Sequence, residues 1–159
     1  MTGLMLDQDG ILIAAPDVGE KGYLDARITV ASPGGHSSVP PPHTSIGLLA
    51  LLISHLEAHP HTPRLTRKSP FYEAIQCLAQ HSSTFSPDVV KDIRRAVGGS
   101  DKALKRVERA LFEHPELGAK LAALLGTTQA VDLIEGGVKV NALPESASAV
   151  VNHRISADR

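Results

Sequence analysis

The chain has 159 residues, 42% of them hydrophobic and 21% charged, so it can bury a core and is not compositionally disordered. Its net charge of -1 carries no basic excess, and its longest apolar run, Ile46 to Ile53, is far shorter than the roughly 20 residues of a membrane-spanning helix. We therefore expect no nucleic-acid partner and no membrane contact by this segment. The single cysteine, Cys77, excludes an intramolecular disulfide and a cysteine-rich zinc site.

Residues 1–19 alternate short apolar runs with Asp7, Asp9 and Gly10, which predicts a strand, a turn and a second strand. This piece is too short to be a unit, so we interpret it as an edge hairpin or as the remnant of a larger domain. Residues 21–32 then alternate with a period of two, which predicts a half-buried strand. Its buried face would carry Leu24, Ala26, Ile28 and Val30, and its wet face Tyr23, Asp25, Arg27 and Thr29.

The Gly- and Pro-rich stretch from Ser32 to Pro42 predicts an exposed connection. Thr44 or Ser45 is expected to cap a helix that runs to about Ala58. Its buried stripe would comprise Ile46, Leu49, Ile53 and Leu56, widened by Leu48, Leu51 and Leu52.

Residues 66–126 have helical patterns throughout, which predicts a helical insertion. We expect helices over about 71–81, from Pro87 to Gly98, after Ser100, and from Pro115 to Gly126. Cys77 falls inside the first of these with no evident base nearby, so a buried structural thiol is expected.

Strand patterns return over 127–134, 138–143 and 146–155, with a turn at Gly136-Gly137. The element order is thus strand, helix, helical insertion and two or three antiparallel strands. This order predicts an α+β fold: a small antiparallel sheet with helices on one face, plus the insertion.

Three polar residues are not obviously required by the fold. His36 follows a glycine pair that permits close backbone approach, and its imidazole suits a carboxylate or a developing oxyanion; the alternative is a solvated loop histidine. Asn141 precedes a strand that Pro144 ends, and it either caps that strand or presents an amide to a ligand. Arg154 offers a two-pronged donor suited to a carboxylate, although exposed arginines are common. Together these donors are suited to binding an anion.

Motifs for metal binding and nucleophilic catalysis are missing. The eight histidines show no H-x-D or H-E-x-x-H spacing, and there is neither a G-x-S-x-G motif nor a P-loop. We therefore assign no metal ligand in this chain.

Two segments carry a family resemblance. EKGYLDARITVASPGGHSSVPPPHTSIGLLA resembles the start of the lid, or dimerisation, domain of M20-type zinc metallopeptidases, nearest to the fungal Gly-X carboxypeptidases and the carboxypeptidase S group. EGGVKVNALPESASAVVNHRIS is similar to the G-x-x-x-N-x-x-P stretch of that family and the strand behind it. The resemblance implies that residues 20–159 form a ferredoxin-like lid whose closing helix and strand are absent from this sequence.

The resemblance also implies roles for the three donors. His36 matches the lid histidine that steadies the scissile carbonyl oxygen, often from the partner subunit; Asn141 matches a substrate-binding asparagine, and Arg154 the arginine that grips the substrate's C-terminal carboxylate. The implied enzyme is a homodimeric carboxypeptidase acting on short peptides, with a pair of zinc ions held by a separate catalytic domain. The carboxypeptidase S resemblance suggests the vacuole.

The sequence departs from the family pattern at the zinc ligands. Asp7-Gln8-Asp9-Gly10 stands where the family has Asp-Glu-Gly, and Gln8 is a poor zinc ligand, so the isolated chain is expected to be inactive. The rival interpretation is a non-catalytic dimerisation or interaction module, and a third is that 66–126 form a docking surface for a separate partner.

Overall fold

The computed structural model describes residues 3–6, 10, 12–15, 19–81 and 83–157. The chain divides into two compact units. One comprises Gly22–Thr62 and Thr127–Ile155, and the other comprises Met1–Lys21, Pro63–Gly126 and Ser156–Arg159. The predicted α+β class is confirmed, and each unit has its own buried core.

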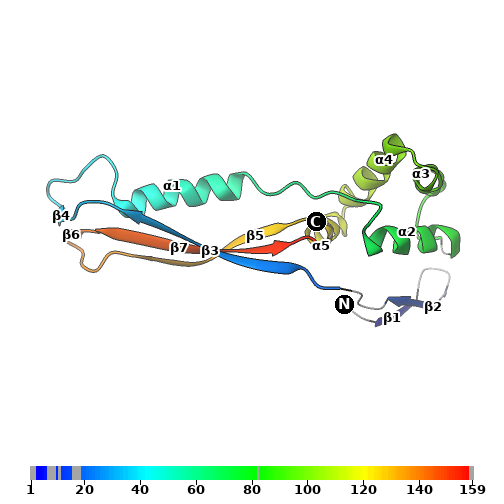
Figure 1. Ribbon diagram of the computed structural model, residues 1–159, viewed down its shortest axis with the longest axis horizontal. Helices are drawn as coiled ribbons and strands as arrows, with labels where there is room; N and C mark the ends of the chain where they lie inside the picture. The colour runs from blue at the N-terminus through cyan, green and yellow to red at the C-terminus, as the bar shows by residue number, and fades with distance from the viewer. Residues whose placement is uncertain (1–2, 7–9, 11, 16–18, 82, 158–159) are drawn as a thin grey trace. The chain divides into compact units, whose positions relative to one another are not determined.

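The first unit is a three-stranded antiparallel sheet with a single long helix, α1, along one face (Figure 1). The strand order is β3-β7-β5, with β7 in the centre. A separate two-stranded ladder, β4-β6, completes the unit. The element bounds are β3 Gly22–Ala31, β4 Gly35–His36, α1 Ser45–Ala58, β5 Thr128–Gly136, β6 Ala142–Leu143 and β7 Ser146–Ile155.

The core of this sheet unit follows from the predicted periodicities. Leu49 of α1 is fully buried against Ala147 and Ala149 of β7, with Ile28, Val30, Ile53 and Val131 packed around them. The Thr44 hydroxyl accepts the Gly47 N–H and caps α1, as expected. The alternation of β3 holds except at Leu24, which is 55% exposed because it lies near the start of an edge strand.

The predicted widening of the α1 stripe is wrong. Ile46, which is predicted to lie in the buried stripe, is 42% exposed, and Leu48, Leu51 and Leu52 are 37%, 58% and 46% exposed. A helix on a sheet buries only the side turned toward the strands, so a stripe wider than that side stays uncovered in this unit.

The strand predicted over 138–143 is also wrong for most of its length. Only Ala142–Leu143 forms a strand, while Val138 and Val140 are fully exposed. Gly137, with φ of 76°, turns the chain after β5, and residues 138–140 pair with no strand of the described chain. The β-branched side chains there lack the cross-strand neighbours that stabilise a strand.

The second unit is mainly helical. It contains α2 Pro70–His81, α3 Pro87–Val97, α4 Asp101–Phe112 and α5 Gly118–Leu125, together with the antiparallel pair β1 Gly3–Leu6 and β2 Leu12–Ala15. The last helix begins at Gly118 rather than Pro115, because residues 115–117 form a turn. The interpretation of residues 1–19 as the remnant of another domain stays a prediction. The bounds of the helical insertion, 66–126, also stay a prediction.

The helices pack around Ile75, Ile93 and Val107. The Arg106 guanidinium donates to both carboxylate oxygens of Asp92 at 2.6 Å, which joins α4 to α3 and holds the pKa of Asp92 below its ordinary value. Cys77 is exposed, contrary to expectation, because it lies two residues beyond Ile75 and therefore on the opposite side of α2. No described helix is long and apolar enough to cross a bilayer.

The sheet core predicts a contrast between two leucines of the same helix. Leu49→Ala removes a fully buried side chain and should lower the free energy of unfolding by about 2–5 kcal/mol. Leu51→Ala, at an exposed position, should change it by no more than about 0.5 kcal/mol. Urea unfolding of the two variants measures the difference; equal losses would contradict the assigned core.

Candidate functional site

One backbone carbonyl fastens three elements at an end of the sheet. The Pro144 carbonyl accepts hydrogen bonds from the Ser32 hydroxyl at 3.1 Å and the Ser45 hydroxyl at 3.0 Å. The Ser32 N–H also donates to the neighbouring Glu145 carbonyl at 2.9 Å. The end of β3, the start of α1 and the link from β6 to β7 therefore meet at this corner.

The β4-β6 ladder lies beyond that corner, at the end of the sheet where α1 begins (Figure 1). Gly35 pairs with Leu143 and His36 with Ala142. A Cβ on Gly34 would lie 2.9 Å from the Cγ of Glu145, and one on Gly35 would lie 3.2 Å from Leu143. The glycine pair is thus needed for the close approach of the two short strands.

His36 ends β4 and is exposed. Its Nδ1 lies 2.8 Å from the Ser38 hydroxyl and accepts the Ser38 backbone N–H at 3.2 Å. The imidazole is therefore folded against its own turn and held there, rather than extending freely as a solvated loop histidine would.

Asn141 lies in the turn that leads into β6. Its backbone carbonyl accepts the Ser37 N–H at 3.3 Å, and the turn is closed by the Ala142 N–H donating to Lys139. The Asn141 residue is exposed, and its side-chain amide makes no hydrogen bond to any residue described. Its main chain thus places it beside His36, which leaves the amide available to a ligand.

Arg154 lies at the other end of the sheet. It is opposite Tyr23 of β3 and Thr128 of β5, and its guanidinium carbon is 5.9 Å from the centre of the Tyr23 ring. On the same face, the Asn152 amide donates to Asp25 at 2.6 Å. Within the described part of the chain no carboxylate pairs with Arg154, so its planar fork is available to a carboxylate.

Two of the three predicted site residues lie close together in the fold, and the third lies far from them. His36 and Asn141 are brought together by the β4-β6 ladder. Arg154 is eight positions along β7 from Ser146, which at 3.3 Å per residue is a separation of about 26 Å from the corner. One copy of this chain does not bring Arg154 to the same small ligand as the other two.

The prediction from sequence missed the serines that hold the site in place. Ser45 is completely buried although it is polar, and Ser32 and Ser38 bond to Pro144 and His36. A serine directly after the N-cap of an apolar helix is a usable signal for Ser45, and the spacing of two residues after the histidine is one for Ser38.

The described residues do not fit a metal centre. No group of three or more His, Cys, Asp or Glu side chains gathers within the part of the chain that the structure describes. His55 lies beside His59 and His61 beside His153, with ring centres 4.1 Å and 5.8 Å apart, but neither pair has a third ligand. The Gln8 position lies outside the described residues.

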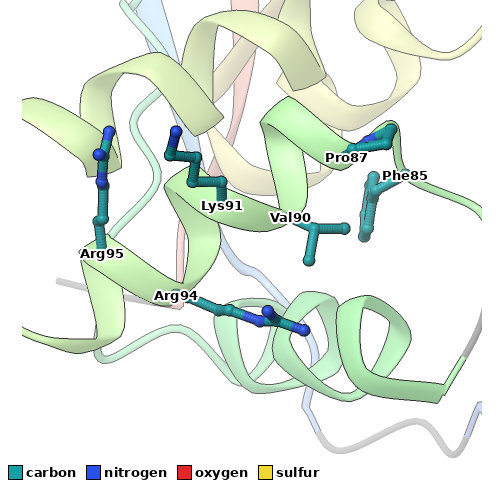
Figure 2. A pocket seen from close by; sticks show the side chains of 6 residues that line it. All are labelled: Phe85, Pro87, Val90, Lys91, Arg94 and Arg95. Carbon is teal, nitrogen blue, oxygen red and sulfur yellow. The ribbon is translucent and has the colours of Figure 1, made fainter.

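A hollow of about 650 Å³ lies on the helical unit (Figure 2). None of the three candidate residues lines this hollow. Its lining combines apolar side chains with three cations and consists of Phe85, Pro87, Val90, Lys91, Arg94 and Arg95. The three candidate residues themselves lie at the two ends of the sheet, and their roles stay predictions.

Comparisons with known proteins identify the family of the chain as a whole. Residues 18–158 match the family model described as the M20 peptidase dimerisation domain. The chain is 40% identical over 154 residues to carboxypeptidase S of Saccharomyces cerevisiae, covering 97% of this chain and 26% of the relative. It is 38% identical over 164 residues to an uncharacterised carboxypeptidase of Schizosaccharomyces pombe, covering 99% of this chain and 24% of that protein.

A more distant relative is named for a different activity. The N-fatty-acyl-amino acid synthase/hydrolase of Bos taurus is 32% identical over 146 residues, covering 89% of this chain and 26% of the relative. The chain thus spans about a quarter of the length of these curated relatives. No solved structure matches it.

The Pro144 corner predicts a contrast between two serines of α1. Ser45→Ala removes a buried hydroxyl that bonds Pro144, so it should lower the free energy of unfolding by about 1 kcal/mol and speed amide exchange at Ser32. Ser54→Ala, at an exposed position of the same helix, is the matched control and should change neither quantity. Hydrogen exchange measured by NMR makes the comparison; identical exchange in both variants would contradict the fastening role.

Proposed function

Because this chain belongs to the M20 peptidase dimerisation-domain family, we propose that it is the lid of a homodimeric, zinc-dependent carboxypeptidase that acts on short peptides. The carboxypeptidase names of the yeast relatives support the reaction class. In this proposal the zinc ions and the general base are held by a catalytic domain of the parent protein, and no group of three or more His, Cys, Asp or Glu side chains gathers among the described residues of this chain. A vacuolar location stays a prediction.

The chemistry of the three donors supports a substrate-binding role. His36 would donate to the oxygen of the scissile carbonyl as negative charge develops there, and the Asn141 amide would bind the adjacent peptide group. Arg154 would pair with the free C-terminal carboxylate. The amide bond and free carboxylate of an N-acyl amino acid present the same two groups, which is consistent with the name of the bovine relative.

The observation that carries this proposal is the separation of the two ends of the sheet. A scissile carbonyl and the C-terminal carboxylate beyond it are a few bonds apart, whereas Arg154 lies about 26 Å from Ser146 at the corner, and His36 and Asn141 lie beyond that corner. Two copies related by a two-fold axis that runs between them can lie side by side with their sheets in opposite directions, so that each copy sets its His36 end beside the Arg154 end of the other. We therefore place His36 and Asn141 of one protomer with Arg154 of the other.

Complementation between variants of the complete enzyme tests this arrangement. His36→Ala should lower kcat by about 10²–10³-fold, as loss of an oxyanion donor does. A heterodimer of His36→Ala and Arg154→Ala protomers contains one site with both changes and one with neither, so it should recover about half of the wild-type turnover. The measurement is peptidase activity of heterodimers purified with two different affinity tags.

Two controls complete the test. Arg154→Ala should abolish the preference for a free carboxylate over the corresponding amide, whereas Arg27→Ala, on the same sheet face, should keep it. Heterodimers as inactive as the parent variants would show that both residues act within one chain and would contradict the proposal. Unchanged turnover of His36→Ala would remove its role.

The second candidate function is a non-catalytic dimerisation or interaction module. The exposed leucines of α1 and the free edges of β3 and β5 favour association of some kind, because unpaired strand edges and apolar helix faces invite a partner. This candidate needs none of the three donor side chains, so turnover that is insensitive to all three would favour it.

A charge introduced on the exposed apolar side of α1 should weaken the proposed dimer. Leu51→Glu places a carboxylate on the exposed apolar side of α1 and should shift the complete protein toward the monomer. Leu124→Glu is the matched control, because Leu124 is also 58% exposed but lies on the helical unit. Light scattering after size-exclusion chromatography gives the masses; a dimer unaffected by Leu51→Glu would exclude α1 from the interface.

A further inference from the structure

The side chain of His36 is part of a small closed structure with Ser38. The His36 carbonyl accepts the Val39 N–H at 3.1 Å, which closes the turn after β4. Inside this turn the imidazole Nδ1 receives the Ser38 backbone N–H at 3.2 Å and lies 2.8 Å from the Ser38 hydroxyl. Both polar groups of Ser38 are thus directed at the same ring nitrogen.

These contacts decide which ring nitrogen carries the proton. A backbone N–H is only a donor, so the nitrogen that it faces must be the acceptor. A neutral imidazole has one acceptor and one donor nitrogen, and Nδ1 is therefore the bare one. The other tautomer would set two N–H groups against each other across 3.2 Å.

We propose that Ser38 is a positioning residue that holds His36 as the Nε2–H tautomer, with that proton offered to the substrate. The inference rests on the proposed function and deepens it. Both Ser38 contacts are to Nδ1, and among the described residues Nε2 has no hydrogen-bond partner. His36 then acts as a hydrogen-bond donor to the carbonyl oxygen and not as a base, because a base needs its lone pair at Nε2.

Solid-state NMR of the complete protein labelled with 15N-histidine tests the tautomer without reference to activity. The His36 signals are assigned by their disappearance in His36→Gln. We expect a protonated Nε2 and an unprotonated Nδ1 in the neutral ring. A proton on Nδ1 would overturn the inference, whatever the activity of the enzyme.

Variants of the complete enzyme test the role of the Ser38 hydroxyl. Ser38→Ala should lower kcat about threefold to tenfold with little change in KM, because one hydrogen bond that orients the ring is lost. Ser38→Thr keeps the hydroxyl and should restore kcat, while Ser37→Ala removes a neighbouring exposed hydroxyl and should have no effect. Equal behaviour of Ser38→Ala and Ser37→Ala would overturn the positioning role.

Two replacements of His36 separate this inference from the proposed function. A glutamine amide places its N–H near the position of Nε2, and an asparagine amide places its own near Nδ1. His36→Gln should therefore retain more turnover than His36→Asn. Equal loss in both, together with a protonated Nε2 in the NMR spectrum, would overturn the proposed oxyanion role and leave the tautomer assignment intact.

Discussion

The position of the candidate site depends on the hydrogen bonds to the Pro144 carbonyl. Ser45 is completely buried, and a buried hydroxyl without a partner is unfavourable, so its bond to this carbonyl is strongly favoured. The second acceptor position is taken by Ser32 at the end of β3. Since Pro144 also interrupts the strand between β6 and β7, one residue both ends the short ladder and ties it to the sheet core. The placement of His36 and Asn141 follows from that attachment.

Local patterns predict the regular elements because their causes are local. The alternation in β3 and β7, the Thr44 cap of α1 and the Pro87 start of α3 all appear where expected. Some errors have local causes, such as the position of Cys77 on α2, but others occur where a distant neighbour decides the outcome. Val138 and Val140 are strand formers without a partner strand, and Leu51 belongs to a helix side that nothing in its unit covers.

In the candidate site, too, the residue types can be predicted from local sequence, but their positions relative to one another cannot. The donor chemistry of His36, Asn141 and Arg154 is visible in the sequence, because it depends only on residue type. Their grouping is not, since His36 meets its ladder partner Ala142 more than a hundred positions along the chain. The register of β7 against β3 places Arg154 at the far end of the sheet, and no motif near Arg154 encodes that register.

The donor character of all three residues limits what this chain contributes to a reaction. An imidazole N–H, an amide N–H and a guanidinium all stabilise negative charge by donating hydrogen bonds to it. If the carboxylate of a substrate is held equally in the ground state and the transition state, Arg154 lowers KM and sets selectivity without raising kcat. A donor placed at the developing oxyanion acts differently, because its bond strengthens only as charge accumulates on the oxygen. A rigidly held Nε2–H at His36 meets that charge with little reorganisation, which makes the small turn formed with Ser38 as important to the proposed chemistry as the histidine itself.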